Sequence, residues 1–173
     1  ITSNFSNLIF SCSVPSQWHM EHRVTDHCVV FVRQGKLLIS DKGRTEEIPA
    51  GSCVFLKKDC SVRLVKASFA GKNYEGLNIR LPQNILEDYF QRHLKNNEFS
   101  QDFTGLSNCF MRLNRTLCLQ GLLSSIILFV EEGQDPGQKM TELKVEELIL
   151  DLLQTNIRFF PTLFDFYRDW NVE

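Results

Sequence analysis

"VVFVRQGKLLISDKGRTEEIPAGSCVFLKK", residues 29–58, decides the fold of this chain. Short runs rich in Val, Ile, Leu and Phe alternate in it with turns at positions 34–35, 41–43 and 49–51, each of which contains a glycine. Apolar runs at this spacing are typical of antiparallel strands joined by tight turns. Strands that follow one another so closely favour a β-sandwich or a β-barrel.

The same pattern continues on both sides of this stretch. Six predicted strands precede Pro82, at residues 8–12, 28–34, 36–40, 52–56, 61–67 and 75–81. In the last of them, Leu77 and Ile79 alternate with Asn78 and Arg80. Because successive side chains of a strand point to opposite faces, this strand has one apolar and one polar face.

After Pro82 the apolar residues change from strand spacing to helical spacing. One helix is predicted directly after Pro82, two more at 116–130 and 140–154, and a last one that begins at Pro161. Residues 109–113 could form a short strand between them. The predicted fold class is therefore α+β, with an antiparallel β-unit in residues 1–82 and a helical segment in residues 83–173.

The two middle helices carry more apolar surface than one covered side can bury. Helix 116–130 is apolar nearly all round, and helix 140–154 has a broad apolar arc and a second, narrower one. A soluble protein rarely leaves such a patch bare, and a second copy docking helix against helix would cover it. We therefore predict a homodimer. The predicted interface residues are Leu117, Leu128, Met140, Leu143 and Leu150. The alternative is that the C-terminal aromatic helix folds back over the patch.

Charge and hydropathy argue against two classes of partner. The net charge is -2, and no cluster of basic residues exceeds the pair Lys57 and Lys58, whereas duplex DNA is usually bound by a basic stripe. No apolar run reaches the ~18 residues that cross a bilayer. We expect neither direct DNA binding nor membrane insertion by these residues.

The six cysteines leave two interpretations open. Cys28 and Cys53 lie in apolar strand runs and Cys118 in an apolar helix, where a free thiol serves as a small hydrophobe. No C-x-x-C pair is present. We favour reduced, buried thiols in a cytoplasmic protein, and the even number leaves a secreted, disulfide-linked module as the alternative.

Gly43, Pro49 and Gly51 form a G-x5-P-x-G pattern that resembles the cupin barrel. Metal-binding cupins place two histidines and a glutamate before the glycine of the first hairpin. Here Cys28 stands at the glutamate position, and of the histidine pair only His22 is present. We expect a metal-free barrel that holds no cofactor.

Three histidines close in sequence deserve separate consideration as metal ligands. His19, His22 and His27 could in principle gather a metal with a carboxylate, but their spacing prescribes no ligand geometry. No histidine occurs in residues 28–92 to complete a cupin site. We favour surface or hydrogen-bonding roles for all three.

No catalytic constellation is evident either. The G-x-S-x-G, H-E-x-x-H and glycine-rich phosphate-binding motifs are all absent, so we predict no catalytic residue. Polar or basic residues do alternate with apolar ones on the last two predicted strands. If that face lines the barrel interior, a buried guanidinium requires an anionic or carbonyl partner. The predicted ligand pocket lies near Phe31, Arg63, Asn78 and Arg80. The alternative is that these residues face water.

Five phrases, in order, resemble the N-terminal half of AraC-type transcriptional regulators, especially the branch similar to ExsA. They are "NLIFSCSVPSQ", "DHCVVFVRQGKLLISDKGRTEEIPAGSCVFLKK", "YEGLNIRLPQNILEDYF", "LKVEELILDLLQTN" and "FFPTLFDFYRDW", and together they span residues 7–170. The resemblance implies a bacterial cupin-like sensor barrel (a double-stranded β-helix) followed by a helical dimerisation segment. It further implies a non-catalytic domain that receives a small-molecule or protein effector.

The two helix-turn-helix motifs with which such regulators contact DNA are not found in these residues. The resemblance therefore implies that DNA is bound only through a further domain. Two other classes remain as alternatives. One is a free-standing cupin enzyme, an isomerase or dioxygenase, which the missing ligands disfavour. The other is a secreted binding module, which glycosylation sequons at 4–6 and 114–116 weakly permit.

Overall fold

The computed structural model describes residues 2–95 and 104–166, and this part of the chain contains two antiparallel sheets. The six-stranded sheet has the order β1-β2-β9-β4-β7-β10, and the four-stranded sheet has the order β3-β8-β5-β6. The strands are β1 Ser3–Phe5, β2 Ile9–Val14, β3 Trp18–Arg23, β4 His27–Gln34, β5 Lys36–Asp41, β6 Arg44–Pro49, β7 Cys53–Leu56, β8 Ser61–Ala67, β9 Tyr74–Leu81 and β10 Phe110–Arg112.

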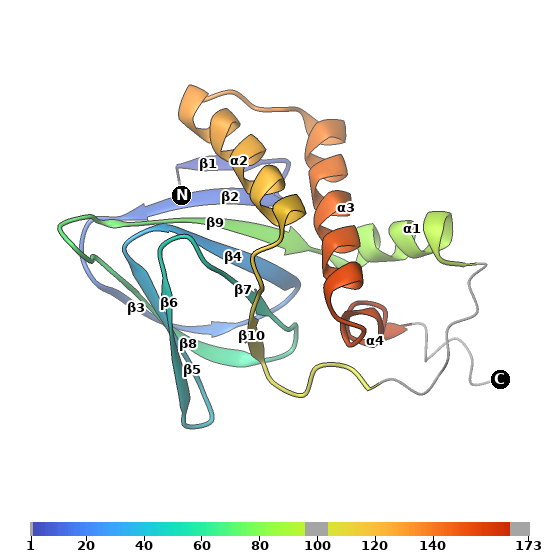
Figure 1. Ribbon diagram of the computed structural model, residues 1–173, viewed down its shortest axis with the longest axis horizontal. Coiled ribbons are helices and arrows are strands. Elements are labelled where there is room, and N and C mark those ends of the chain that lie inside the picture. The colour runs from blue at the N-terminus through green and yellow to red at the C-terminus, as the bar shows by residue number, and fades with distance from the viewer. Residues whose placement is uncertain (1, 96–103, 167–173) are drawn as a thin grey trace.

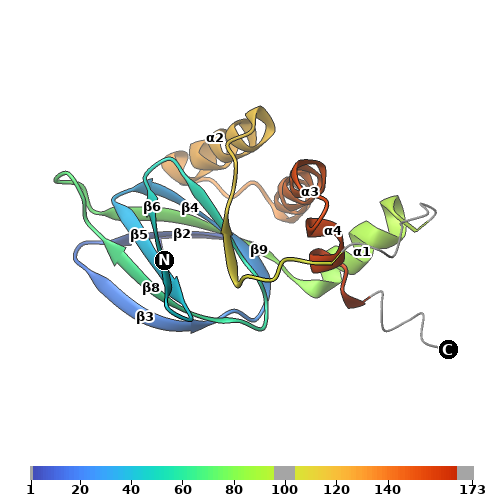
Figure 2. The same cartoon turned by 60° about the horizontal axis from the view of Figure 1, so that its bottom comes forward.

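The two sheets face each other as a barrel, and the helices lie together on the outer side of the six-stranded sheet (Figures 1 and 2). The helices are α1 Gln83–His93, α2 Leu117–Glu132, α3 Gln138–Thr155 and α4 Phe159–Leu163. This arrangement confirms the predicted α+β, cupin-like class. The last helix begins at Phe159, two residues before the predicted start at Pro161, because Phe159 is itself buried against the barrel.

The hairpin between β5 and β6 shows how the turns set the strand register. Asp41 pairs with Arg44 across a turn formed by Lys42 and Gly43, both of which have positive φ. Turns of this kind match the twist of paired strands and favour glycine. At Gly35, between β4 and β5, a Cβ atom would lie 2.5 Å from the carbonyl oxygen of Ala67, so no other residue fits there.

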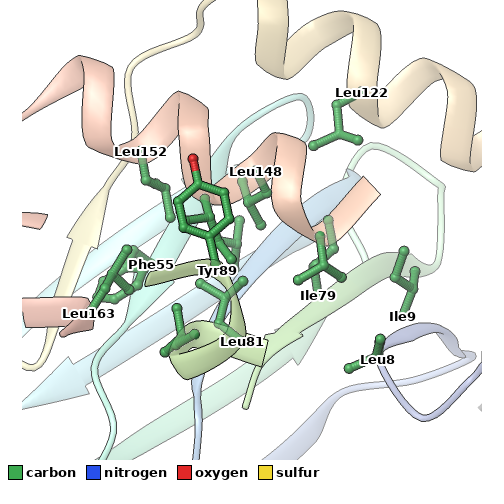
Figure 3. Close-up of a cluster of buried hydrophobic side chains, with 14 of the residues drawn as sticks. Leu8, Ile9, Phe55, Ile79, Leu81, Tyr89, Leu122, Leu148, Leu152 and Leu163 are labelled. Atoms are coloured by element: carbon green, nitrogen blue, oxygen red, sulfur yellow. The ribbon is translucent and has the colours of Figure 1, made fainter. Parts of the chain in front are cut away.

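Alternation along the strands creates two separate cores. Val30 and Val32 of β4 point into the barrel, while Val29 points toward the helices. The inner core also contains Leu37, Ile39, Ile48, Val54, Leu56, Val62 and Leu64. The outer core lies between the six-stranded sheet and the helices, and ten of its residues are labelled in Figure 3: Leu8, Ile9, Phe55, Ile79, Leu81, Tyr89, Leu122, Leu148, Leu152 and Leu163.

Helix α2 has well-defined ends. At its start, the Thr116 hydroxyl accepts a hydrogen bond from the Leu119 main-chain N–H at 3.0 Å and donates one to Asp151 of α3 at 2.8 Å. At its end, Gly133 takes up the left-handed conformation that commonly terminates helices. The Thr116 cap therefore also ties α2 to α3, because Asp151 is buried between them.

Residues 104–116, which we call the strap, lead along the barrel into α2 (Figure 1). Strand β10 lies in the strap and pairs with β7, with Phe110 opposite Leu56. The Leu113 N–H adds a further bond of 2.9 Å to the Cys53 carbonyl oxygen. The barrel thus takes one strand from beyond residue 82, inside the segment predicted to be helical.

Candidate functional site

A pocket of about 490 Å³ lies between the barrel and helix α2. Its walls come from β4, the turn between β6 and β7, the start of β7, the strap and α2, so residues 31–53 of the barrel meet residues 112–127. Pockets of this size hold small organic ligands. Because α2 forms one wall, a molecule in this pocket would contact the sheet and the helix at once.

The floor of this pocket is apolar. Phe31 contributes from β4, and Leu119, Leu123 and Ile127 contribute from successive turns of α2. These residues also belong to, or pack against, the core between sheet and helices. The pocket therefore borders that core, and an apolar group could pack against these residues, while Gln120 and Ser124 add polar groups to the same wall.

The rim of the pocket is polar and basic. The Arg112 guanidinium donates a hydrogen bond of 2.9 Å to the Ser52 hydroxyl. Arg115 is exposed and also lines the pocket. Burial raises the pKa of the Cys53 thiol to about 12, and the Arg115 charge acts in the opposite direction, which places this guanidinium near the pocket wall. Two guanidinium groups over an apolar floor suit a ligand with an apolar body and an anionic end.

The four residues predicted to form the ligand pocket do not come together. Phe31 lines the pocket just described, on the outer side of the six-stranded sheet. Arg63 lies on the other sheet between the inward-facing Val62 and Leu64, is exposed, and donates a 2.7 Å hydrogen bond to Glu21. Their side chains thus lie on different sides of the barrel.

Asn78 and Arg80 lie on the inner face of the six-stranded sheet. Asn78 pairs with Val30, which points into the barrel, and Arg80 pairs with Cys28. Arg80 binds the Asp26 carboxylate and donates 2.8 Å to the Asn7 carbonyl oxygen, so it has the anionic and carbonyl partners that its position requires. The Asn78 Oδ1 atom is buried without a hydrogen-bond partner within residues 2–95 and 104–166.

The five predicted interface residues are all exposed on the outer surfaces of α2 and α3. Leu117 and Leu128 lie on the side of α2 opposite Leu122 and Ile126, which are buried. On α3, Met140, Leu143 and Leu150 are exposed, while other apolar residues of the helix are buried. We call this set the outer ridge: Leu117, Leu128, Met140, Leu143 and Leu150. Its assembly with a second copy stays a prediction.

His27 is buried where α4 meets the barrel. Its ring stacks on Phe55 at 5.5 Å, and its Nδ1 accepts a 3.0 Å hydrogen bond from the Lys58 main-chain N–H, so the proton of the neutral ring is on Nε2. Burial, and then the Lys58 charge, lower the pKa of His27 to about 4, while Asp165 and the Thr162 main chain oppose this. The His27 Nε2 atom forms no hydrogen bond with the Thr162 main chain within the described residues.

We expect this histidine to make the fold sensitive to mild acid. Its pKa is about 4 in the folded protein and 6.5 in the unfolded chain, so its contribution is complete above pH 6.5 and is lost as the pH falls toward 4. The difference is worth about 3 kcal/mol. Urea titrations across this range should show a shallower loss of stability for His27→Asn than for the wild type. His19→Asn, at an exposed position, should retain the wild-type slope; equal slopes in all three would refute the assignment.

The histidines near the N-terminus do not converge. His19 and His22 lie on β3, whereas His27 is enclosed under α4. In the described part of the chain, no three His, Cys, Asp or Glu side chains are grouped so that they could hold a metal ion. The same residues contain no helix long and apolar enough to cross a membrane.

The expectation of reduced, buried thiols is wrong for three cysteines. Cys60 and Cys109 form a disulfide with their Cα atoms 5.6 Å apart, because the pairing of β10 with β7 brings Cys109 beside the turn that contains Cys60. Cys118 is exposed, since it lies in the first turn of α2, away from the sheet. Cys28 and Cys53 are buried free thiols, as expected.

The barrel with helices on one of its sheets has the cupin-like fold. Residues 27–159 match the family described as the ExsA N-terminal regulatory domain, and the chain is a member of that family. A comparison with curated protein sequences finds no match.

Solved structures of ToxT from Vibrio cholerae share this fold. An apo form of a ToxT variant from strain SCE256 has a TM-score of 0.64 at 14% identity, over 88% of this chain and 57% of ToxT. Wild-type ToxT bound to an unsaturated fatty acid has a TM-score of 0.58 at 13% identity, over 85% of this chain and 53% of ToxT. ToxT from strain O395 bound to a methylnaphthalenyl butenoic acid has a TM-score of 0.54 at 12% identity, over 85% and 57%. The chain thus spans little more than half the length of ToxT.

The sequence predicted only one residue of the pocket, Phe31. The others were missed because the strap and α2 become neighbours of β4 only through the pairing of β10 with β7. One signal was present: Arg112 and Arg115 lie close together in the sequence just before Thr116, the N-cap of α2.

Proposed function

We propose that this domain receives an anionic effector in the pocket between the barrel and α2, and passes the signal through α2 to a dimer interface. The observation that carries the proposal is the position of α2. One side of this helix forms the pocket floor through Leu119 and Leu123, and the opposite side carries Leu117 and Leu128 of the outer ridge. A shift of α2 around a bound molecule would move both surfaces together.

The chemistry of the pocket supports an effector with an apolar body and a carboxylate. Its floor is apolar, and Arg112 and Arg115 supply positive charge at the rim. ToxT, which has the same fold, has been solved with an unsaturated fatty acid and with an aromatic butenoic acid. A protein effector that inserts an acidic side chain at the same rim is the other candidate that the two guanidinium groups favour.

The proposed regulator acts as a homodimer in the cytoplasm and catalyses no reaction. Membership of a regulatory family supports a non-catalytic role. The outer ridge supports the dimer, because a second copy would cover five exposed apolar side chains. Contact with DNA is assigned to a further domain, since the net charge of this chain is -2.

Titration with oleate tests the pocket. We expect the wild-type domain to bind oleate and to bind oleyl alcohol, which has the same tail but no charge, at least about tenfold more weakly, because a charge-assisted hydrogen bond is worth roughly 1.5–3 kcal/mol. Arg112→Ala with Arg115→Ala should remove this preference for the acid. Intrinsic fluorescence or calorimetric titration measures the four affinities, of the wild type and the variant for each ligand.

Arg63→Ala is the matched control, because Arg63 is an exposed arginine on the other sheet and lines no part of this pocket. It should bind oleate as the wild type does. If Arg63→Ala loses the preference and the Arg112 and Arg115 variant keeps it, the pocket is assigned to the wrong side of the barrel. If neither the wild type nor either variant binds oleate more tightly than oleyl alcohol, the proposal of an anionic effector is wrong.

A further inference from the structure

The disulfide between Cys60 and Cys109 closes the strap onto the barrel at the point where the strap begins to pair. Cys60 ends the turn between β7 and β8, and Cys109 directly precedes β10. The Cys109 carbonyl oxygen also accepts a 2.8 Å hydrogen bond from the Lys57 N–H. The bond joins positions 49 residues apart, so it links the strap to a part of the barrel that precedes α1.

The strap leads from this bond straight to the pocket and to α2. Strand β10 follows Cys109 directly, and residues 112–115 then form the basic rim of the pocket. The next residue, Thr116, caps α2. Anything that frees the strap at Cys109 therefore acts on the rim and on the start of the helix. Most residues of the two cores lie outside the strap, although Phe110 belongs to the inner core and Leu106 packs against the outer one.

Leu106 packs against the outer core, and few polar contacts besides hold the beginning of the strap within the described residues. The Lys57 ammonium donates 2.9 Å to the Leu106 carbonyl oxygen, and the Leu106 N–H donates 2.8 Å to the Thr162 hydroxyl of α4. After Cys109, Phe110 is buried in the barrel core. Cys60 and Cys109 belong to the inner core, but each keeps a little exposed surface, 9% and 8%, so the bond lies at the outer margin of that core. A thiol reagent reaches such a bond after a small local opening.

We propose that Cys60 and Cys109 form a reversible redox clasp, which holds the strap on the barrel when oxidised and releases its first part when reduced. Disulfides in cytoplasmic proteins of mesophilic organisms are usually transient or redox-sensing, which agrees with this role. The clasp itself is independent of the proposed effector. Its effect on the pocket rests on the proposed function, because it passes through Arg112 and Arg115 at the rim.

Reduction requires a dithiol reductant. A thiolate of the reductant attacks one sulfur of the bond, forms a mixed disulfide and releases the other cysteine as a thiolate, which takes up a proton. The second thiolate of the reductant then attacks the mixed disulfide. Two electrons and two protons reach Cys60 and Cys109, and the dithiol becomes a disulfide. Oxidation by a small-molecule disulfide reverses the same steps.

Hydrogen–deuterium exchange of the full chain, with and without dithiothreitol, tests the clasp. Amides of residues 106–113 should exchange at least about tenfold faster in the reduced protein, while those of the core helix α3 stay unchanged, because only the strap loses its attachment. Cys60→Ser with Cys109→Ser should show the fast exchange under both conditions. Cys12→Ser with Cys118→Ser, which changes two free cysteines, should respond to dithiothreitol as the wild type does.

Three results would overturn the clasp. The first is peptide mapping under non-reducing conditions. If it finds Cys60 and Cys109 unpaired after treatment with oxidised glutathione, the disulfide does not form. If the strap amides exchange equally fast in the oxidised and the reduced protein, the disulfide does not hold the strap in place. Faster exchange throughout α3 as well shows a general structural crosslink instead of a local clasp. A clasp that opens in a domain that binds no oleate would leave the clasp standing and contradict only the proposed effector.

Discussion

Replacing Leu143 and Leu150 together with aspartate is expected to turn the proposed dimer into a monomer at micromolar concentration. Both leucines are exposed on α3 in the single chain and would be buried against a second copy. Burying a leucine is worth ~1.5–3 kcal/mol, and two-fold symmetry makes each substitution count twice. The dissociation constant should therefore rise by at least about a thousandfold, since each 1.4 kcal/mol is a factor of about ten.

Sedimentation velocity measures this effect directly. Phe69→Asp is a matched control, because Phe69 and Leu143 are both 57% exposed and Phe69 lies in the loop between β8 and β9, far from the outer ridge in sequence. The control should stay dimeric. A wild-type chain that is monomeric under the same conditions, or a double variant whose mass does not change, would refute the interface.

The second large effect is expected at Phe159. This residue is fully buried, and its ring packs edge-on against Phe55 of β7 with the centroids 5.0 Å apart. Phe159 belongs to the outer core and thus anchors α4 to the barrel. Phe159→Ala should lower the free energy of unfolding by about 3–5 kcal/mol, because it leaves a cavity that neither element can close.

Urea titration at a fixed protein concentration checks this value, since dimerisation makes apparent stability depend on concentration. Arg158→Ala is the control at the neighbouring, exposed position and should change the free energy of unfolding by less than about 0.5 kcal/mol. A loss of under about 1 kcal/mol for Phe159→Ala would show that α4 is not anchored to the barrel by this ring.

Most strands could be predicted because their apolar runs are buried on at least one face. The structure confirms β2, β4, β5, β7, β8 and β9 near their predicted bounds. Strands β3 and β6 were missed because their sequences, "WHMEHR" and "RTEEIP", are mostly polar and contain only short apolar signals. They form the two edges of the four-stranded sheet, where few side chains are buried and pairing alone holds the strand.

The side of the barrel on which a residue lies was only partly predictable. Asn78 and Arg80 face inward, because strict alternation with apolar residues separates the two faces of β9. Phe31 belongs to a run that is apolar on both faces, and such a run does not tell which face is inside. Arg63 lies between Val62 and Leu64, which face inward, so the alternation along its strand already placed Arg63 on the outer face.

The exposure of the outer ridge was predictable and the disulfide between Cys60 and Cys109 was not. When a sheet covers one apolar side of a helix, a second apolar side stays exposed. The residues at 117, 128, 140, 143 and 150 are exposed in this way. The pairing of Cys60 with Cys109 depends on β10, whose partner strand lies more than fifty residues earlier in the chain. Spacing between cysteines carries no information about such a contact.

The dissociation constant of the dimer, measured by sedimentation with and without saturating oleate, tests the central claim most directly. If α2 connects the pocket to the outer ridge, occupancy of one surface must change the affinity of the other by the same factor in both directions. We predict a change of at least about fivefold, the lower end of typical coupling between two sites. At an oleate concentration that saturates the wild type but not the Arg112 and Arg115 double alanine variant, the variant should show a smaller change. A dimer constant that is the same with and without bound oleate would contradict the account.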